Sequence, residues 1–140
     1  MQKTRRKKQY RNRCDFDSDY MMTYFSARLR SIGYACKGII TLVCTQPNAQ
    51  LHAAATAGVL IGGYFLKLCE GEWLAVILCI GLVWVAEALN TALEFVADEV
   101  DPNHRPGIGR AKDVAAAGVL IAAVISIVVA ATILWNHFFS

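Results

Sequence analysis

Three long apolar segments constrain the fold of this 140-residue chain more than any other feature. They cover residues 51–68, 73–97 and 114–135. Each falls in the range of roughly 17–25 residues that a helix needs to cross a bilayer. Lipid offers no hydrogen-bond partner to an open backbone, so such segments are expected to be helical. The sequence therefore predicts an all-α membrane protein with three transmembrane helices.

Two different segments precede the first span. Residues 1–24 are rich in charge and show no apolar period, which predicts a basic, disordered tail. Residues 25–45 repeat apolar side chains at helical spacing, with Arg28, Arg30 and Lys37 on another side. This pattern predicts an amphipathic helix on the membrane surface, although a helix packed on a soluble core shows a similar one. Residues 25–140 are thus expected to form one membrane domain.

The cations of the chain are distributed unevenly, and their positions predict its orientation. Seven of the 14 Lys and Arg residues fall in the first 13 positions, and others lie between the second and third spans. Residues 69–72 and the segment after Trp135 contain neither Lys nor Arg. Positive residues favour the cytoplasmic side, so the N-terminus and the long loop are predicted there, with the chain in the cell inner (cytoplasmic) membrane. No nucleic-acid motif accompanies the basic tail, so no nucleic-acid partner is expected.

The middle span carries a narrow polar stripe. Glu87, Asn90, Glu94 and Asp98 interrupt an otherwise apolar segment. At 100° per residue, Glu94 and Asp98 lie about 20° to either side of Glu87. Such groups can hydrogen-bond a neighbouring helix and specify packing. However, ionisable groups at membrane depth cost at least a few kcal/mol, so aligned carboxylates favour divalent-cation binding or proton transfer.

The loop after the stripe favours phosphate chemistry. Arg105 and the sequence "GRAKD" (109–113) bring cations to the same predicted interface. Mg²⁺ held by one or two carboxylates, with Lys and Arg nearby, is a common arrangement for nucleotide phosphates. Phosphoryl transfer also needs a base for the acceptor's proton, and a glutamate can serve. "GIGRAKD" lacks the spacing of a Walker loop, so nucleotide binding without a P-loop is predicted.

Three stretches together resemble a known family. "EALNTALEFVAD" (87–98), "GRAKD" and the upstream "GYACKG" (33–38) are similar to the small integral-membrane prokaryotic diacylglycerol kinase and undecaprenol kinase family. The resemblance extends over about residues 25–135. It implies a homotrimeric bundle with active sites between subunits at the membrane–cytoplasm boundary. It also implies a lipid kinase that uses ATP and Mg²⁺ to phosphorylate the hydroxyl of a membrane lipid alcohol.

The resemblance also implies roles for individual residues. Glu87 would be the general base facing the lipid alcohol, with Asn90 and Arg30 on the substrate side. Glu94 would hold Mg²⁺. The residues expected at ATP are Tyr34, Glu94, Asp98, Arg105, Lys112 and Asp113.

This chain departs from the family pattern at two places. Gln46 stands where the family usually has a second metal-binding glutamate, and an amide is the weaker ligand because it lacks the negative charge. A kinase of reduced activity, or an impaired homologue, is therefore an alternative. His104–Arg105 replaces the family's Tyr-His pair.

The substrate and one further function remain open at this point. "TQPNAQLHAA" resembles the undecaprenol-type members, whereas "GYACKG", "GRAKD" and "LWNHF" resemble the diacylglycerol branch. The balance favours undecaprenol slightly. A different class of function, a proton-coupled small-molecule transporter with Glu87 as its carrier, is also compatible with a buried glutamate.

Overall fold

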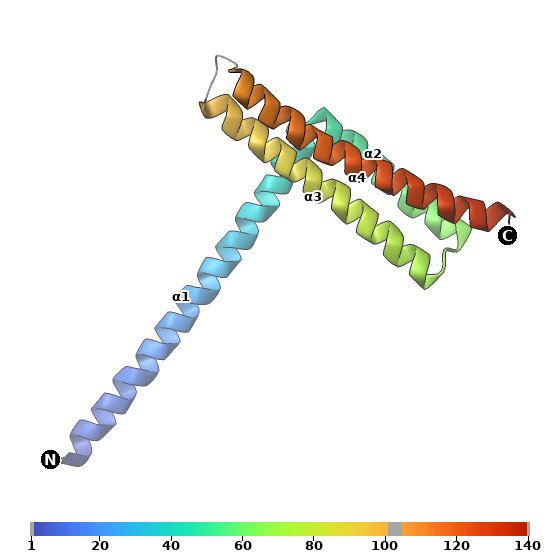
Figure 1. The fold of residues 1–140 in the computed structure, drawn as a ribbon. Coiled ribbons are helices and arrows are strands. Elements are labelled where there is room, and N and C mark those ends of the chain that lie inside the picture. The colour runs from blue at the N-terminus through green and yellow to red at the C-terminus, as the bar shows by residue number, and fades with distance from the viewer. Residues whose placement is uncertain (1, 101–104, 140) are drawn as a thin grey trace. The chain divides into compact units, whose positions relative to one another are not determined.

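The computed structural model describes residues 2–100 and 105–139, with side chains from residue 21 onward. It contains four helices, α1 (Gln2–Thr45), α2 (Pro47–Leu66), α3 (Glu70–Val100) and α4 (Pro106–Phe139) (Figure 1). No strand occurs in these two ranges, which confirms the predicted all-α class. His104 lies outside them.

Helix α1 begins earlier than the sequence analysis predicts. The sequence predicts a tail over 1–24 and a helix over 25–45, whereas the structure has one helix from Gln2 to Thr45. No proline or glycine occurs before Gly33, so nothing in the covalent chain interrupts the helix there. Residues up to Ile40 form a structural unit of their own. Within it Arg28 lies 5.0 Å from the Tyr24 ring centroid, a cation–π contact.

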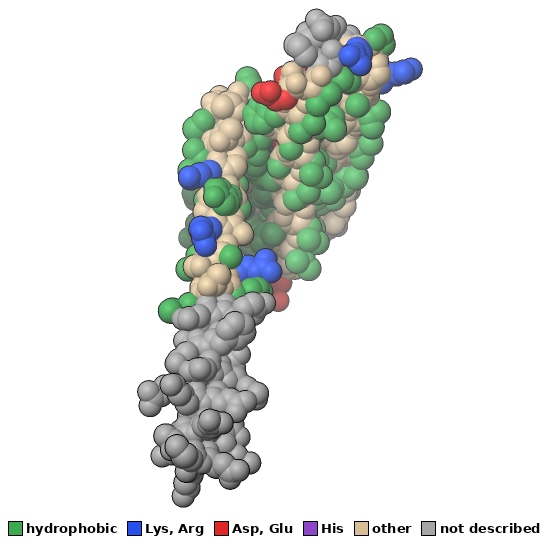
Figure 2. All heavy atoms as spheres, turned by 90° about the vertical axis from the view of Figure 1, so that its left-hand side faces the viewer, with side chains coloured by type: hydrophobic (Ala, Val, Ile, Leu, Met, Phe, Trp, Pro, Cys, Tyr) green, Lys and Arg blue, Asp and Glu red, His purple; other side chains and the backbone are tan. Residues whose placement is uncertain are grey.

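Helices α2, α3 and α4 form the second unit, which also includes the end of α1. Helix α3 packs against α2 and, more extensively, against α4. All three are long and apolar enough to cross a membrane, as predicted. Large apolar side chains point outward from each of them, among them Phe65, Leu89 and Ile127. On the face seen in Figure 2, green hydrophobic side chains cover most of the described surface of these helices. Such a surface suits lipid rather than water.

A tight turn sets α2 and α3 antiparallel. Lys67 ends α2 in the left-handed conformation (φ 54°, ψ 49°), and the Leu68 N–H bonds the Gly63 carbonyl at 3.2 Å. The Glu72 carboxylate then accepts a 2.8 Å hydrogen bond from the Cys69 N–H and caps the start of α3. Because the turn is short, the first residues of α2 lie beside the C-terminal half of α3.

Candidate active site

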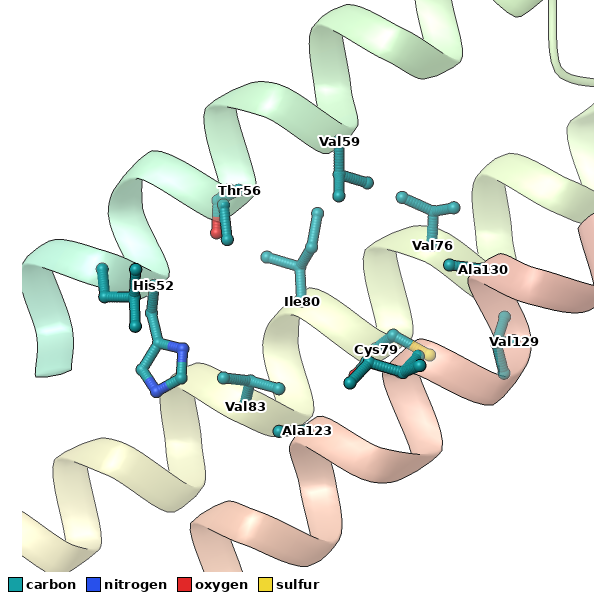
Figure 3. A pocket seen from close by; sticks show the side chains of 14 residues that line it. His52, Thr56, Val59, Val76, Cys79, Ile80, Val83, Ala123, Val129 and Ala130 are labelled. Carbon is teal, nitrogen blue, oxygen red and sulfur yellow. The ribbon is translucent and has the colours of Figure 1, made fainter. Parts of the chain in front are cut away.

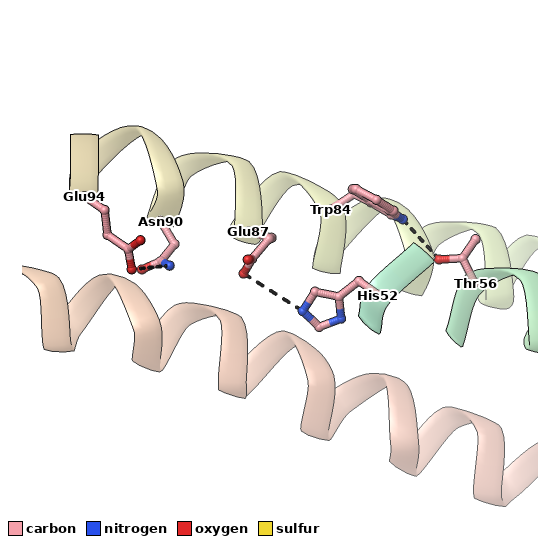
Figure 4. Close-up of polar contacts among 6 residues, drawn as sticks. All are labelled: His52, Thr56, Trp84, Glu87, Asn90 and Glu94. Atoms are coloured by element: carbon pink, nitrogen blue, oxygen red, sulfur yellow. Dashed lines mark hydrogen bonds and ion pairs between the residues drawn. The ribbon is translucent and has the colours of Figure 1, made fainter. Parts of the chain in front are cut away.

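Three polar side chains of α3 are buried against the neighbouring helices. Glu87, Asn90 and Thr91 are 1%, 4% and 4% exposed. Figure 4 shows Glu87, Asn90 and Glu94 extending from α3 toward α4. Glu87 Oε2, Asn90 Oδ1 and Thr91 Oγ1 have no hydrogen-bond partner among the described residues. Buried polar atoms are normally satisfied, so these three mark a place where a ligand can supply the missing bonds.

Asn90 and Glu94 form a pair one helical turn apart. The Asn90 Nδ2–H donates to Glu94 Oε1 at 3.0 Å, which leaves the Asn90 carbonyl oxygen unpaired. Glu94 is half-buried. Carboxylate and amide oxygens are ligands that Mg²⁺ accepts, and Mg²⁺ usually takes its remaining ligands from water and phosphate. In the described ranges no three His, Cys, Asp or Glu side chains gather as a metal cluster, so any Mg²⁺ here would have few ligands from this chain.

Asp98 and Lys112 connect α3 with α4. The Lys112 Nζ donates to Asp98 Oδ1 at 2.9 Å. The Lys112 side chain is 32% exposed and the Asp98 side chain 62%. A solvated pair of this kind contributes little to stability, so its interest lies in which residues it brings together. This ion pair brings together two of the residues that are predicted to bind ATP. Asp113 follows as an exposed side chain, and the Arg105 carbonyl accepts the Ile108 N–H at 3.0 Å where α4 begins.

Three other predicted residues belong to other segments of the chain. Arg30 and Tyr34 belong to α1, in the unit that ends at Ile40. There the Arg30 Nε–H donates to the Ser26 carbonyl at 3.3 Å, and Tyr34 is exposed. Gln46 is the N-cap residue of α2, and its side chain makes no capping hydrogen bond, so its carbonyl oxygen is not committed to the helix. Their roles stay predictions.

His52 joins the site without having been assigned a role from the sequence. Its Nε2 lies 3.9 Å from Glu87 Oε2, and the two side chains are 18% and 2% exposed (Figure 4). At this distance the two groups are in close polar contact, but they are too far apart for a hydrogen bond. The sequence does show His52 as a polar residue near the start of the first apolar span. Its partner could not be read from spacing, because the two residues lie on different helices.

An apolar groove of about 420 Å³ opens between α2, α3 and α4, with His52 at one end (Figure 3). Thr56, one turn after His52, accepts a 3.1 Å hydrogen bond from the Trp84 indole and thereby joins α2 to α3. The groove therefore combines an apolar length with a polar end beside Glu87. Its lining comprises Leu51, His52, Ala55, Thr56, Val59, Val76, Cys79, Ile80, Val83, Ala123, Ser126, Ile127, Val129 and Ala130.

Comparison with known proteins gives one consistent match. The pattern of the family described as prokaryotic diacylglycerol kinase matches residues 33–134. The chain is 40% identical to the undecaprenol kinase of Bacillus subtilis (strain 168) over 100 residues, which cover 71% of this chain and 81% of that protein. It is 28% identical to the diacylglycerol kinase of Escherichia coli (strain K12) over 116 residues, 83% of this chain and 95% of that protein. It is 36% identical to the diacylglycerol kinase of Synechocystis sp. (strain ATCC 27184 / PCC 6803 / Kazusa) over 108 residues, which cover 76% of this chain and 61% of that protein.

Proposed function

Because the chain belongs to the prokaryotic diacylglycerol kinase family and is a membrane lipid kinase, we propose that it transfers the γ-phosphoryl group of ATP to the hydroxyl of a membrane lipid alcohol. The family predicted from residues 33–38, 87–98 and 109–113 is thereby confirmed. One observation carries the proposal for the site. The buried Glu87 carboxylate has an oxygen without a hydrogen-bond partner, and it lies beside His52, where an apolar groove ends.

Glu87 acts as the general base in this proposal. The lipid chain lies in the apolar groove, which brings its hydroxyl to the polar end beside Glu87. The hydroxyl O–H bond breaks as its proton passes to the Glu87 carboxylate, and the alcohol oxygen bonds to the γ-phosphorus. The bond from that phosphorus to the bridging oxygen of ATP breaks, which releases ADP. The products are the lipid phosphate and a protonated Glu87.

Glu94 and Asn90 are the residues that fit Mg²⁺. The Glu94 carboxylate is half-buried, and the unpaired Asn90 oxygen lies on the same helix one turn away. Mg²⁺ bound there would neutralise phosphate charge, with Gln46 as a weaker additional ligand. Lys112 supplies positive charge for the phosphates. Tyr34, Asp98, Arg105 and Asp113 are proposed to complete the nucleotide site.

The lipid alcohol that we propose is undecaprenol. The 40% identity to an undecaprenol kinase exceeds the 28% and 36% identities to diacylglycerol kinases. An apolar groove is compatible with an isoprenoid chain. We also propose a homotrimer with a cytoplasmic N-terminus in the cell inner membrane. The transporter alternative has no support in the family match, which is to kinases.

The test is an assay of lipid phosphate formation in detergent–lipid micelles, with undecaprenol and diacylglycerol supplied in separate reactions. We expect undecaprenol to be phosphorylated faster than diacylglycerol. We also expect activity to be lost when EDTA removes Mg²⁺ and to return when excess Mg²⁺ is added. Faster turnover of diacylglycerol would reassign the substrate. Absence of phosphorylation on either alcohol, with ATP and Mg²⁺ present, would contradict the proposed function.

Gln46 offers a gain-of-function prediction. Replacing Gln46 with glutamate restores the charge that the family pattern has at this position, so we expect the Mg²⁺ concentration for half-maximal activity to fall about tenfold. The matched control is Asn48→Asp, which adds the same charge to an exposed position two residues later. The measurement is a Mg²⁺ titration of initial rates at saturating ATP. An equal shift in both variants would mean that Gln46 acts through general electrostatics rather than as a ligand.

A further inference from the structure

A base buried as deeply as Glu87 must lose its proton after every turnover. Its side chain is 2% exposed, and it lies within α3 in a segment apolar enough to cross a membrane. Water therefore reaches the carboxyl group poorly. If the proton stayed on Glu87, the next lipid hydroxyl would meet a carboxylic acid rather than a base. The proposed reaction therefore needs a second group that takes this proton.

His52 is the side chain placed to do this. Its Nε2 is 3.9 Å from Glu87 Oε2, and its own side chain is 18% exposed, so it connects the buried carboxyl group with a more accessible region. His52 lies five residues after Pro47, about 7.5 Å along α2 from the start of that helix. Figure 4 shows its ring extending from α2 to the Glu87 carboxylate.

The other groups around the groove are less suited to the task. The Thr56 hydroxyl is engaged by Trp84, and α4 contributes aliphatic side chains and Ser126. The Ser126 hydroxyl donates to the Ala122 carbonyl at 2.8 Å. Among the described lining residues, His52 and Cys79 are the titratable ones. Imidazole is the side-chain type that gains and loses a proton at physiological pH.

We infer that His52 accepts the proton that Glu87 takes from the lipid hydroxyl and so returns Glu87 to its carboxylate form. This role rests on the proposed kinase function. The two atoms first come about 1 Å closer, into hydrogen-bond range, by side-chain rotation. The Glu87 Oε2–H bond then breaks and the His52 Nε2–H bond forms. The imidazolium then releases a proton to water. His52 thus acts through Glu87 and does not contact the phosphoryl group.

The experiment compares the first turnover with the later ones in rapid-quench kinetics. The purified protein is mixed with undecaprenol, Mg²⁺ and ATP in detergent–lipid micelles, and lipid phosphate is measured over time. In His52→Gln and His52→Ala we expect one product per site at nearly the wild-type rate, followed by steady turnover slowed by about 10²-fold. The KM for the lipid stays unchanged. Added imidazole speeds the steady phase of His52→Ala, since it can occupy the vacated space.

Gln50→Ala is the matched control, because Gln50 is an exposed residue on the same helix. It should follow the wild type in both phases. Equal slowing of the first and later turnovers in both His52 variants would show a structural role and overturn the inference, as would wild-type kinetics in either variant. If His52→Ala fails to fold, His52→Gln decides the question, since it keeps a hydrogen-bond donor but cannot accept the proton. A wild type without ATP-dependent phosphorylation overturns the proposed function itself, and this role with it.

Discussion

We expect the replacement of Glu87 with glutamine to remove lipid phosphorylation almost completely. The amide has nearly the same size and keeps a polar group at the buried position, but it cannot accept a proton from the alcohol. General-base catalysis typically contributes about 10²–10⁴-fold to a rate, so kcat should fall within that range or below detection. The measurement is the initial rate of lipid phosphate formation in micelles at saturating ATP, Mg²⁺ and undecaprenol.

Glu70→Gln is the control for this result. It makes the same chemical change on the same helix, at an exposed position in the first turn of α3. Its kcat should equal that of the wild type. ATP binding should persist in Glu87→Gln, because the nucleotide residues are not altered. A Glu87→Gln protein with kcat within threefold of the wild type would exclude Glu87 as the base.

The second large effect that we expect is a loss of nucleotide binding when Glu94 is replaced with alanine. The carboxylate is the one charged ligand that we propose for Mg²⁺ on α3. Loss of an outer partner of a metal site already weakens affinity by about 10–100-fold, so loss of a direct ligand should weaken Mg²⁺-dependent ATP binding by at least about 100-fold. Isothermal titration calorimetry with a non-hydrolysable ATP analogue, with and without Mg²⁺, measures this change.

Two further variants separate charge from positioning at Glu94. Glu94→Gln keeps an oxygen that can accept the 3.0 Å hydrogen bond from Asn90 but removes the negative charge. It should lose nearly as much Mg²⁺-dependent affinity as Glu94→Ala. Glu99→Ala removes an exposed carboxylate farther along α3 and should leave the affinity unchanged. If Glu94→Gln bound Mg²⁺-ATP as well as the wild type does, the role of Glu94 would be to hold Asn90.

The spanning helices were largely predictable because lipid selects for long apolar runs. The predicted segments 51–68, 73–97 and 114–135 correspond to α2, α3 and α4. The observed helices α3 and α4 extend into polar residues, to Val100 and from Pro106. Apolar content marks where a helix meets lipid, not where its hydrogen bonding ends. For the same reason, a charge-rich N-terminal segment was predicted as a tail even though it contains no helix-breaking residue.

The candidate site was predictable only along one helix. Helical periodicity aligned Glu87, Glu94 and Asp98, with Asn90 beside that line. In the structure Glu87 and Asn90 are buried and Glu94 is half-buried, whereas Asp98, near the end of α3, is exposed. His52 and the apolar groove were not predictable in this way. Their relation to Glu87 depends on the turn between α2 and α3 and on packing between helices, which spacing along one segment does not encode.

The position of Glu87 and Glu94 on a single helix has a consequence for the evolution of such enzymes. Seven residues of α-helix fix about 10.5 Å of axial rise between them. In the proposed reaction, with Glu87 at the lipid alcohol and Glu94 at the Mg²⁺ of ATP, the register between acceptor and donor would follow from the covalent chain, whatever the packing of α2 and α4. Those two helices can change their lining residues to suit a different hydrophobic tail while the chemistry stays in alignment. Such changes are compatible with the relatives of this chain, which are named for two different lipid alcohols.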